Sequence, residues 1–205
     1  VWITPEAEKQ IVLMARVSNP KGQATERSPN GLIQYLAKHK HWSPFEMASM
    51  CVEIATTKDI ACQILRHRSF SFQEFSQRYA STDLLGSSSV PELRLQDHAN
   101  RQNSLTDDFG VLAEEFDGRI KELFQQSEQL YQDMLLRGTA KECARKVLPL
   151  NTPTRLYMSG TIRSWIHYLS IRRGPETQKE HREVAQGISD IFKTHLPIIS
   201  EALLQ

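Results

Sequence analysis

Three segments of this chain have the every-second-residue apolar pattern of β-strands, and they lie irregularly among longer segments with helical spacing. The clearest is residues 47–56, and the other two are residues 69–80 and 154–160. The apolar residues expected on the buried face of the first strand are Ala48, Met50, Val52 and Ile54. Because strands and helices do not alternate strictly, the pattern predicts an α+β fold rather than a doubly wound parallel sheet.

The longest helical pattern covers residues 106–138 and ends on a glycine, which is a favoured residue just after a helix. Gly110 and Gly118 are the positions where this helix is expected to break if it breaks at all. Two further helices are expected over residues 161–174 and 175–196.

A serine run with glycine and proline predicts a variable surface loop over residues 81–106. A chain of 205 residues with 40% hydrophobic residues can bury one substantial core. We therefore expect residues 1–205 to form a single domain. Its central, mostly antiparallel sheet would be flanked by helices, with a long helical excursion.

The formal net charge is only +1, so no global basic field points to nucleic acid or to an anionic membrane. Neither GxGxxG nor GxxxxGK[ST] occurs, so the usual dinucleotide and P-loop motifs are excluded. No apolar run approaches the roughly 18–20 residues that span a bilayer, and the first residues lack the form of a signal peptide. We expect a cytoplasmic protein with no membrane or nucleic-acid partner.

The three cysteines are odd in number and have no CxxC spacing. They are Cys51, Cys62 and Cys143. Each has apolar neighbours in the sequence, so we expect reduced, buried thiols.

The segment KHKHWSPFE, residues 38–46, permits two interpretations. His39, His41 and Glu46 are a candidate metal cluster, but an HxH pair without a firm third ligand is a weak signal. No metal site is therefore predicted. Ser43 and Glu46 also fit a capping box, in which the glutamate would reach back to the start of a helix.

The segment RHRSFSFQEFSQRY, residues 66–79, is unusually rich in arginines, rings and hydroxyl groups. If it is a strand, Ser76 and Arg78 lie on the same side at i, i+2 spacing. Together they offer the hydroxyl and the forked guanidinium that a phosphate needs. Gln63 lies one helical turn before Arg66 and is expected to reach the same place. The alternative is a solvated helix end followed by an edge strand.

Two further clusters contain arginine. Arg145 stands in otherwise apolar helical sequence, where it either extends to solvent or binds an anion. Arg163 and His167 are four residues apart and share a helix face. Arg172 follows Arg163 by nine residues, which places it about 180° round the same helix.

Taken together, these clusters resemble the flavin-dependent thymidylate synthases, whose signature is an RHRxxSxNExSxRY-like segment. This chain departs from it mainly at Gln73, where the family usually has asparagine. The segments ARVS, KHKHWSPFE, ARKVLPLN and IRSWIHYLSIR also look like family segments, in family order.

The resemblance implies an enzyme of dTMP biosynthesis that methylates dUMP reductively. Methylenetetrahydrofolate would give the one-carbon unit, and FAD reduced by NADPH would give the hydride. It also implies a homotetramer whose active sites are shared between subunits. Since Arg163 and Arg172 point in nearly opposite directions, we expect that an isolated monomer cannot hold flavin.

The resemblance assigns residue roles as well. Flavin contacts fall on Ser43, Arg66, His67, Arg68, Glu74, Thr161, Ile162, Arg163 and His167. Contacts to dUMP fall on Gln63, Ile64, Leu65, Arg66, Glu74, Phe75, Ser76, Gln77, Arg78, Arg145 and Arg172. Thr161 and His167 stand where some relatives have asparagine, and both can still form hydrogen bonds.

Arg172 is the catalytic candidate that the resemblance implies. A fixed guanidinium beside the pyrimidine would favour the electron-rich ring without a cysteine nucleophile. Two rival interpretations remain open. One is a nucleic-acid-binding module that stacks bases on Phe70, Phe72 and Phe75. The other is a structural helical protein whose arginines are solvated.

Overall fold

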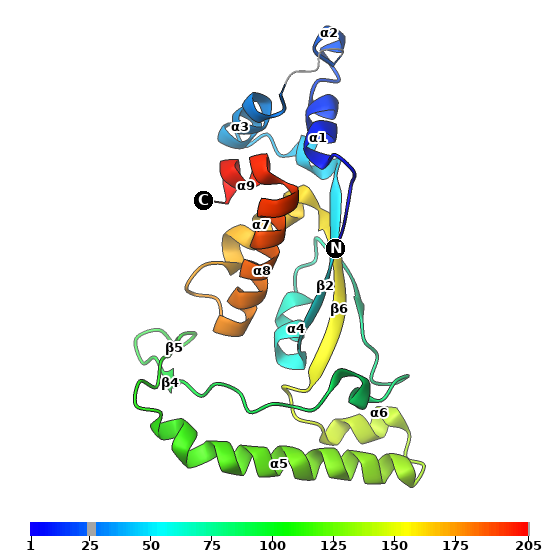
Figure 1. The fold of residues 1–205 in the computed structure, drawn as a ribbon, viewed down its shortest axis with the longest axis vertical. Coiled ribbons are helices and arrows are strands. Elements are labelled where there is room, and N and C mark those ends of the chain that lie inside the picture. Colours follow the sequence, from blue (N-terminus) through cyan, green and yellow to red (C-terminus); the bar gives the residue numbers. More distant parts are fainter. Residues whose placement is uncertain (24–27, 205) are drawn as a thin grey trace. The chain divides into compact units, whose positions relative to one another are not determined.

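The computed structural model describes residues 1–23 and 28–204 and contains helices and two antiparallel sheets (Figure 1). The packing divides the chain into two compact units. Unit 1 comprises Val1–Glu53, His67–Phe72 and Tyr157–Gln205, and unit 2 comprises Ile54–Arg66 and Gln73–Leu156. The α+β class is confirmed, and the single-domain organisation stays a prediction.

The larger sheet has four strands in the order β1-β2-β6-β3. The strands are β1 (Trp2–Ile3), β2 (Ser49–Thr57), β3 (Ser71–Glu74) and β6 (Pro153–Thr161). β1 runs antiparallel to β2, with Trp2 opposite Cys51. The N–H of Ile162 donates to Ala48 O (2.8 Å). The N–H of Lys58 donates to Thr152 O (3.0 Å), so β2 and β6 are also antiparallel.

The first predicted strand is confirmed as β2. Its alternating apolar residues are buried as expected, and none of the four is more than 5% exposed: Ala48, Met50, Val52 and Ile54. The predicted strand at residues 154–160 is likewise confirmed within β6.

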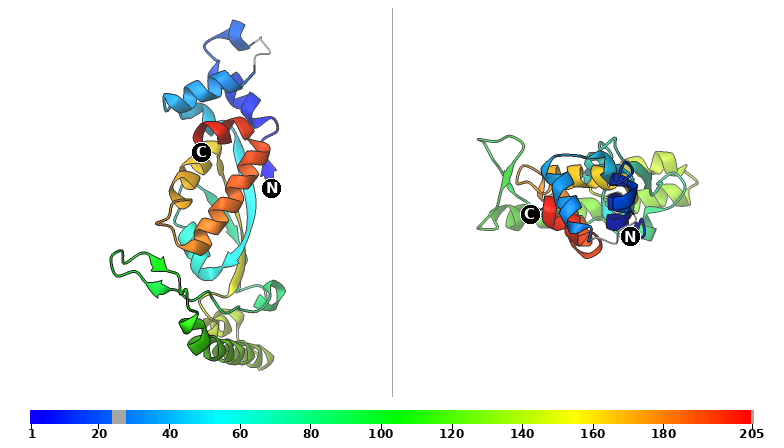
Figure 2. Two further views of the ribbon diagram at one scale, coloured as in Figure 1. Left: turned by 60° about the vertical axis from the view of Figure 1, so that its left-hand side comes forward. Right: turned by 90° about the horizontal axis from the view of Figure 1, so that it is seen from above.

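Unit 1 is built mainly of helices. They are α1 (Ala7–Ala15), α2 (Pro20–Gln23), α3 (Asn30–Lys38), the 3₁₀ helix η1 (Ser43–Glu46), α7 (Ile162–Arg172), α8 (Lys179–His195) and α9 (Pro197–Leu203). Helices α7 and α8 pack side by side, and α3 packs against α9 (Figure 2). Trp165 of α7 is fully buried, and its indole N–H donates to Met50 O (3.0 Å), which attaches α7 to β2.

Unit 2 contains the long helix. Its elements are α4 (Lys58–Ile64), η2 (Thr82–Leu85), the hairpin β4 (Leu95–Gln96) and β5 (Ser104–Leu105), α5 (Val111–Leu136), α6 (Lys141–Ala144) and η3 (Arg145–Val147). α5 begins directly after Gly110, continues through Gly118 without a break, and ends before Gly138. Gly110 and Gly138 have positive φ angles, 66° and 82°, which favour glycine at both ends. Residues 81–106, predicted to be a surface loop, contain the 3₁₀ helix η2 and the hairpin of β4 and β5.

The predicted strand at residues 69–80 is too long. β3 ends at Glu74, and the chain then turns, since the N–H groups of Tyr79 and Ala80 both donate to Ser76 O at 3.1 Å. The placement of Ser76 and Arg78 on one side of a strand is therefore wrong. The apolar spacing of the segment changes from two to three residues at Phe75, which a continuing strand does not accommodate.

The expectation of three buried thiols is wrong, since none of the cysteines is fully buried. Cys62 and Cys143 are exposed, Cys51 is half-buried, and all three are free. On α4 the buried residues are Ile60, Ala61 and Ile64, so the apolar neighbours of Cys62 lie on a different face of the helix. Within the described part of the chain, no helix is long and apolar enough to cross a membrane.

Candidate active site

Unit 1 contains a cavity of about 800 Å³ on the exposed side of α7. Its wall combines cationic, hydroxyl and aromatic groups, among them Lys40, Trp42, Ser69, Arg163, Ser164, His167 and Ser170. Two of these residues, Arg163 and His167, are predicted flavin contacts. As the helix geometry requires, they face this cavity while Arg172 turns toward His67.

Arg163 forms an ion pair with Glu46, which also lines the cavity. Both side chains are partly exposed, at 49% and 40%. η1 has no side-chain cap hydrogen bond, so the predicted capping box of Ser43 and Glu46 is wrong. The carboxylate of Glu46 pairs with Arg163 of α7 instead of forming a capping hydrogen bond in η1.

The start of α7 is held by hydroxyl groups. Thr161 is its N-cap, and its Oγ1 accepts a hydrogen bond from the N–H of Ser164 (3.2 Å). The hydroxyl of Ser164 donates in turn to Ser69 O (3.3 Å). The side chain of Ile162 is fully buried, so of the predicted flavin residues here it offers only backbone atoms.

His67 and Arg172 are joined directly, although 105 residues separate them in sequence. Arg172 is the last residue of α7, and its Nε–H donates to His67 Nε2 at 2.9 Å. Burial, followed by the charges of Arg172 and His167, lowers the pKa of His67 from 6.5 to about 4. His67 is therefore neutral at pH 7, and Arg172 carries the only full charge of the pair.

The other predicted flavin residues of unit 1, Ser43 and Arg68, are exposed. Phe70, three residues after His67, is buried against Trp165, with ring centroids 4.7 Å apart. A buried Phe70 is not available to stack on a base, which counts against the nucleic-acid interpretation.

In unit 2, the carboxylate of Glu74 is positioned by two side chains. It lies 2.8 Å from the ammonium group of Lys58 and accepts a hydrogen bond from Thr154 Oγ1 (3.0 Å). The side chains of Lys58 and Glu74 are only 26% and 20% exposed. These contacts fix the position of the carboxylate at the end of β3.

The residues after Glu74 are presented by the turn. Gln77 is buried (6% exposed) and Arg78 is exposed, with its guanidinium 5.7 Å from the ring centre of Tyr79. Phe75 and Ser76 are half-buried. The N–H of Phe75 donates to Arg155 O (2.8 Å).

The remaining predicted dUMP residues lie at the ends of short helices. Ile64 is fully buried at the end of α4, and the next two residues, Leu65 and Arg66, are exposed. Gln63 and Arg145 are half-buried, and Arg145 begins η3.

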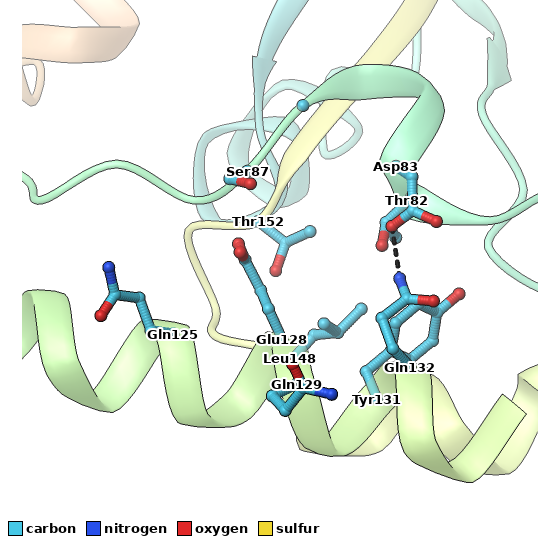
Figure 3. Close-up of a pocket in the computed structure, with 11 residues that line it drawn as sticks. Thr82, Asp83, Ser87, Gln125, Glu128, Gln129, Tyr131, Gln132, Leu148 and Thr152 are labelled. Carbon is cyan, nitrogen blue, oxygen red and sulfur yellow. Dashed lines mark hydrogen bonds between the residues drawn. The ribbon is translucent and has the colours of Figure 1, made fainter. Parts of the chain in front are cut away.

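Two cavities of unit 2 have other walls. One, of about 410 Å³, lies between η2 and α5 and is lined by polar groups including Asp83, Glu128 and Gln132 (Figure 3). The other, of about 480 Å³, is more apolar and includes Leu123 and Phe124. Neither of these two cavities is lined by a predicted dUMP residue.

Several contact residues had no signal strong enough to be predicted. Lys58 looks like an ordinary helix residue and Thr154 like an ordinary strand residue, and only the folded chain brings both to Glu74. Tyr168 of α7 and His181 of α8, which are hydrogen-bonded to each other, belong to apolar helix faces. Trp42 and Ser164 are the sequence neighbours of Ser43 and Arg163, and this proximity is the signal that could indicate them.

His39 and His41 pack around Tyr35, with their ring centroids 6.0 Å apart. Among the described residues, no group of three or more His, Cys, Asp or Glu side chains is placed to hold a metal ion.

Over residues 1–198 the sequence matches the protein family described as thymidylate synthase complementing protein. It is 49% identical over 201 residues to a probable flavin-dependent thymidylate synthase of Paramecium bursaria Chlorella virus 1. The matched region covers 96% of this chain and 90% of that protein. It is 50% identical over 199 residues to the flavin-dependent thymidylate synthase of Synechocystis sp., covering 96% and 89%. The structure is similar to that of the UMP/dUMP methylase PolB from Streptomyces cacaoi bound with 5-Br dUMP. The TM-score is 0.85 at 27% identity, covering 98% and 91% of the two chains.

Proposed function

Since the chain belongs to the flavin-dependent thymidylate synthase family, whose members are methyltransferases, we propose that it converts dUMP to dTMP by reductive methylation. Methylenetetrahydrofolate would donate the one-carbon unit. FAD, reduced by NADPH, would supply the hydride. The name of the structural relative, a UMP/dUMP methylase bound with 5-Br dUMP, supports dUMP as the substrate.

The observation that carries this proposal is the hydrogen bond between Arg172 and His67. It joins the end of one motif, IRSWIHYLSIR, to the RHR of the other. Because the bond uses Nε, the two terminal amino groups of the guanidinium are not engaged by His67. A guanidinium presented in this way suits the edge of a pyrimidine.

The cavity of unit 1 fits an anionic, partly aromatic cofactor such as FAD. Lys40 and Arg163 supply positive charge, and the hydroxyl groups along α7 and at Ser69 supply hydrogen bonds for a pyrophosphate. Trp42 offers an aromatic wall. Ser43, Arg66, His67, Arg68, Glu74, Thr161, Ile162, Arg163 and His167 are the proposed flavin contacts, with Thr161 committed to capping α7 and Ile162 acting through its backbone.

The nucleotide would be held by residues of unit 2. We assign its contacts to Gln63, Ile64, Leu65, Arg66, Glu74, Phe75, Ser76, Gln77, Arg78 and Arg145. The turn at Ser76 changes how they act, because Arg78 is displayed on an exposed turn rather than on a strand. The carboxylate of Glu74 is oriented by Lys58 and Thr154, which makes it a precise hydrogen-bond acceptor.

Arg172 is the proposed catalytic residue. Methylation at C5 requires the uracil ring to act as a nucleophile. A permanently charged guanidinium beside N3 and its neighbouring carbonyl would favour the ionised, electron-rich form of the ring from which C5 attacks. No sulfur nucleophile is needed in this account.

We also propose that the active protein is a cytoplasmic homotetramer with shared active sites. Arg163 and Arg172 face different ligand regions from one helix, so a second subunit is the simplest way to complete each site. An isolated monomer would then not hold flavin, and a stable monomer with one FAD per chain would refute this.

The decisive experiment is spectroscopic and isotopic. The purified protein should be yellow, dUMP should change its flavin spectrum, and tritium should be released from C5-labelled dUMP with methylenetetrahydrofolate and NADPH. A colourless protein that takes up no added FAD and releases no tritium would overturn the proposed function.

A further inference from the structure

A buried polar pair lies behind the His67–Arg172 contact. The hydroxyl of Tyr168 is 3.0 Å from Nε2 of His181, and both side chains are fully buried between α7 and α8. The Tyr168 ring packs edge-to-face with His67, with centroids 4.9 Å apart and planes at 77°. Four side chains therefore form a series of successive contacts from the core of unit 1 to the guanidinium: His181, Tyr168, His67 and Arg172.

Hydrogen-bond chemistry fixes the proton on His67. The Nε–H of arginine can only donate, so Nε2 of His67 must offer a lone pair. A neutral imidazole with a lone pair on Nε2 carries its proton on Nδ1. The contact therefore requires one tautomer and one ring orientation.

The surroundings of His67 favour this neutral form. The ionisable groups that face it are Arg172 and His167 from α7, with Tyr168 on the same helix and His181 on α8. Burial is also the main cause that lowers the pKa of His181 to about 4, and it raises the pKa of the Tyr168 phenol. At pH 7 Arg172 is the only charged member of the series.

A purely structural role explains the Tyr168–His181 pair poorly. The ring of Tyr168 packs against Phe70 and Trp165, with centroids 6.0 and 5.8 Å away, and these ring contacts do not use its hydroxyl. Replacing both partners of a buried hydrogen bond by apolar groups of the same shape is close to neutral for stability.

We propose that Tyr168 and His181 are positioning residues for Arg172. The bond to His181 holds the Tyr168 ring, the Tyr168 ring holds His67 edge-on, and Nε2 of His67 holds the Nε–H of Arg172. The terminal amino groups of Arg172 then point consistently toward the pyrimidine. This inference rests on the proposed function, because it takes Arg172 as the residue that acts on dUMP.

The test uses near-isosteric variants of the flavin-loaded protein. Tyr168→Phe removes one oxygen atom, His181→Leu removes the ring nitrogens, and His181→Gln restores a polar atom near the position of Nε2. The expected loss in kcat for tritium release is about fivefold for the first two, which corresponds to one hydrogen bond of about 1 kcal/mol. His181→Gln should stay within about twofold of wild type if it remakes the bond.

Two control variants lie in the same unit but outside the series. Tyr157→Phe removes an exposed hydroxyl that bonds Glu53 at 2.5 Å, and His195→Gln changes an exposed histidine at the end of α8. Both should leave kcat unchanged. Flavin content and the dUMP-induced change in the flavin spectrum should also be unchanged in Tyr168→Phe, because the lost function is alignment and not binding.

A second readout does not depend on turnover. In ¹⁵N-histidine NMR spectra, His67 of the wild type should be neutral with its proton on Nδ1 at pH 7, and Tyr168→Phe should give a mixture of tautomers. His67→Gln should retain more activity than His67→Asn, since only the longer amide reaches the position of Nε2.

Wild-type kcat in both Tyr168→Phe and His181→Leu would overturn the positioning role, and so would an equal loss in His181→Gln. If Arg172→Ala itself keeps wild-type turnover, the proposed function fails and this inference fails with it. If Arg172→Ala is inactive while the positioning variants are normal, only this inference fails.

Discussion

The carboxylate of Glu46 forms an ion pair with the guanidinium of Arg163 at the wall of the unit 1 cavity. Glu46 therefore offsets part of the positive charge that would attract the flavin phosphates. Glu46→Gln keeps an oxygen acceptor beside Arg163 but removes the negative charge. We expect FAD to bind about two- to fivefold more tightly to this variant, a modest effect because the pair is partly exposed.

The measurement is a fluorescence titration of the apoprotein with FAD. Glu53→Gln is the control, since it removes an exposed carboxylate of the same unit. Tenfold weaker binding to Glu46→Gln would contradict this account and would mean that Glu46 orients Arg163.

Gly160 is needed because the ring of Phe70 lies against it. A Cβ at this position would come within 2.5 Å of the Phe70 ring, closer than two carbons can approach. Gly160→Ala should therefore lower the free energy of unfolding by about 1–3 kcal/mol. Gly187→Ala, on α8 of the same unit, meets nothing within 4 Å and should raise the stability by up to about 1 kcal/mol. Urea denaturation measures both, and equal effects of the two substitutions would contradict the prediction.

His181 makes stability depend on pH. Its pKa is about 4 in the folded protein and 6.5 as the ordinary value, so between these pH values the unfolded chain binds the extra proton. Its contribution is fully present above pH 6.5 and is lost as the pH falls toward 4. The free energy of unfolding should fall by up to about 1.4 kcal/mol per pH unit from this residue. His181→Gln should reduce the slope in urea titrations at pH 7, 6 and 5, and an unchanged slope would refute the assignment.

Lys58 is predicted to act on dUMP through Glu74. Lys58→Ala removes the ion pair and leaves the Glu74 carboxylate with the hydrogen bond from Thr154 Oγ1, so the orientation of the carboxylate should become less defined. We expect kcat/KM for dUMP to fall about fivefold, consistent with the loss of one charge-assisted hydrogen bond in a partly exposed pair. Lys121→Ala on the exposed face of α5 is the control. Equal rates for the two variants would show that Glu74 does not depend on Lys58.

Local patterns predicted the strands and helices well where one face is buried. The alternation around Met50 identified β2, and Gly138 marked the end of α5. The prediction failed at residues 75–80, because the alternation of Phe70 and Phe72 ends before Phe75 and the chain then turns, with hydrogen bonds that converge on Ser76 O. Residues 75–80 contain neither proline nor glycine, the residues that most often indicate a turn in a sequence.

The candidate site was predicted only where its residues share a motif. Arg163 and His167 came from one helix face, and both line the same cavity. The partners Glu46 and Lys58 were not predicted as such, because long-range contacts depend on strand pairing and helix packing that spacing does not encode. The position of Cys62 was wrong for a related reason, since apolar neighbours in the sequence occupy another face of the helix.

The exposed thiols permit a direct test of whether C5 of dUMP reacts without a sulfur nucleophile. Cys62 and Cys143 are accessible, so burial does not exclude them as nucleophiles. A variant with Cys51→Ala, Cys62→Ser and Cys143→Ser should be compared with Arg172→Ala for tritium release from C5-labelled dUMP, each with bound flavin. We expect near-normal release from the cysteine-free protein and a loss of at least about a hundredfold from Arg172→Ala. Loss of release without the cysteines, together with normal release from Arg172→Ala, would contradict this expectation.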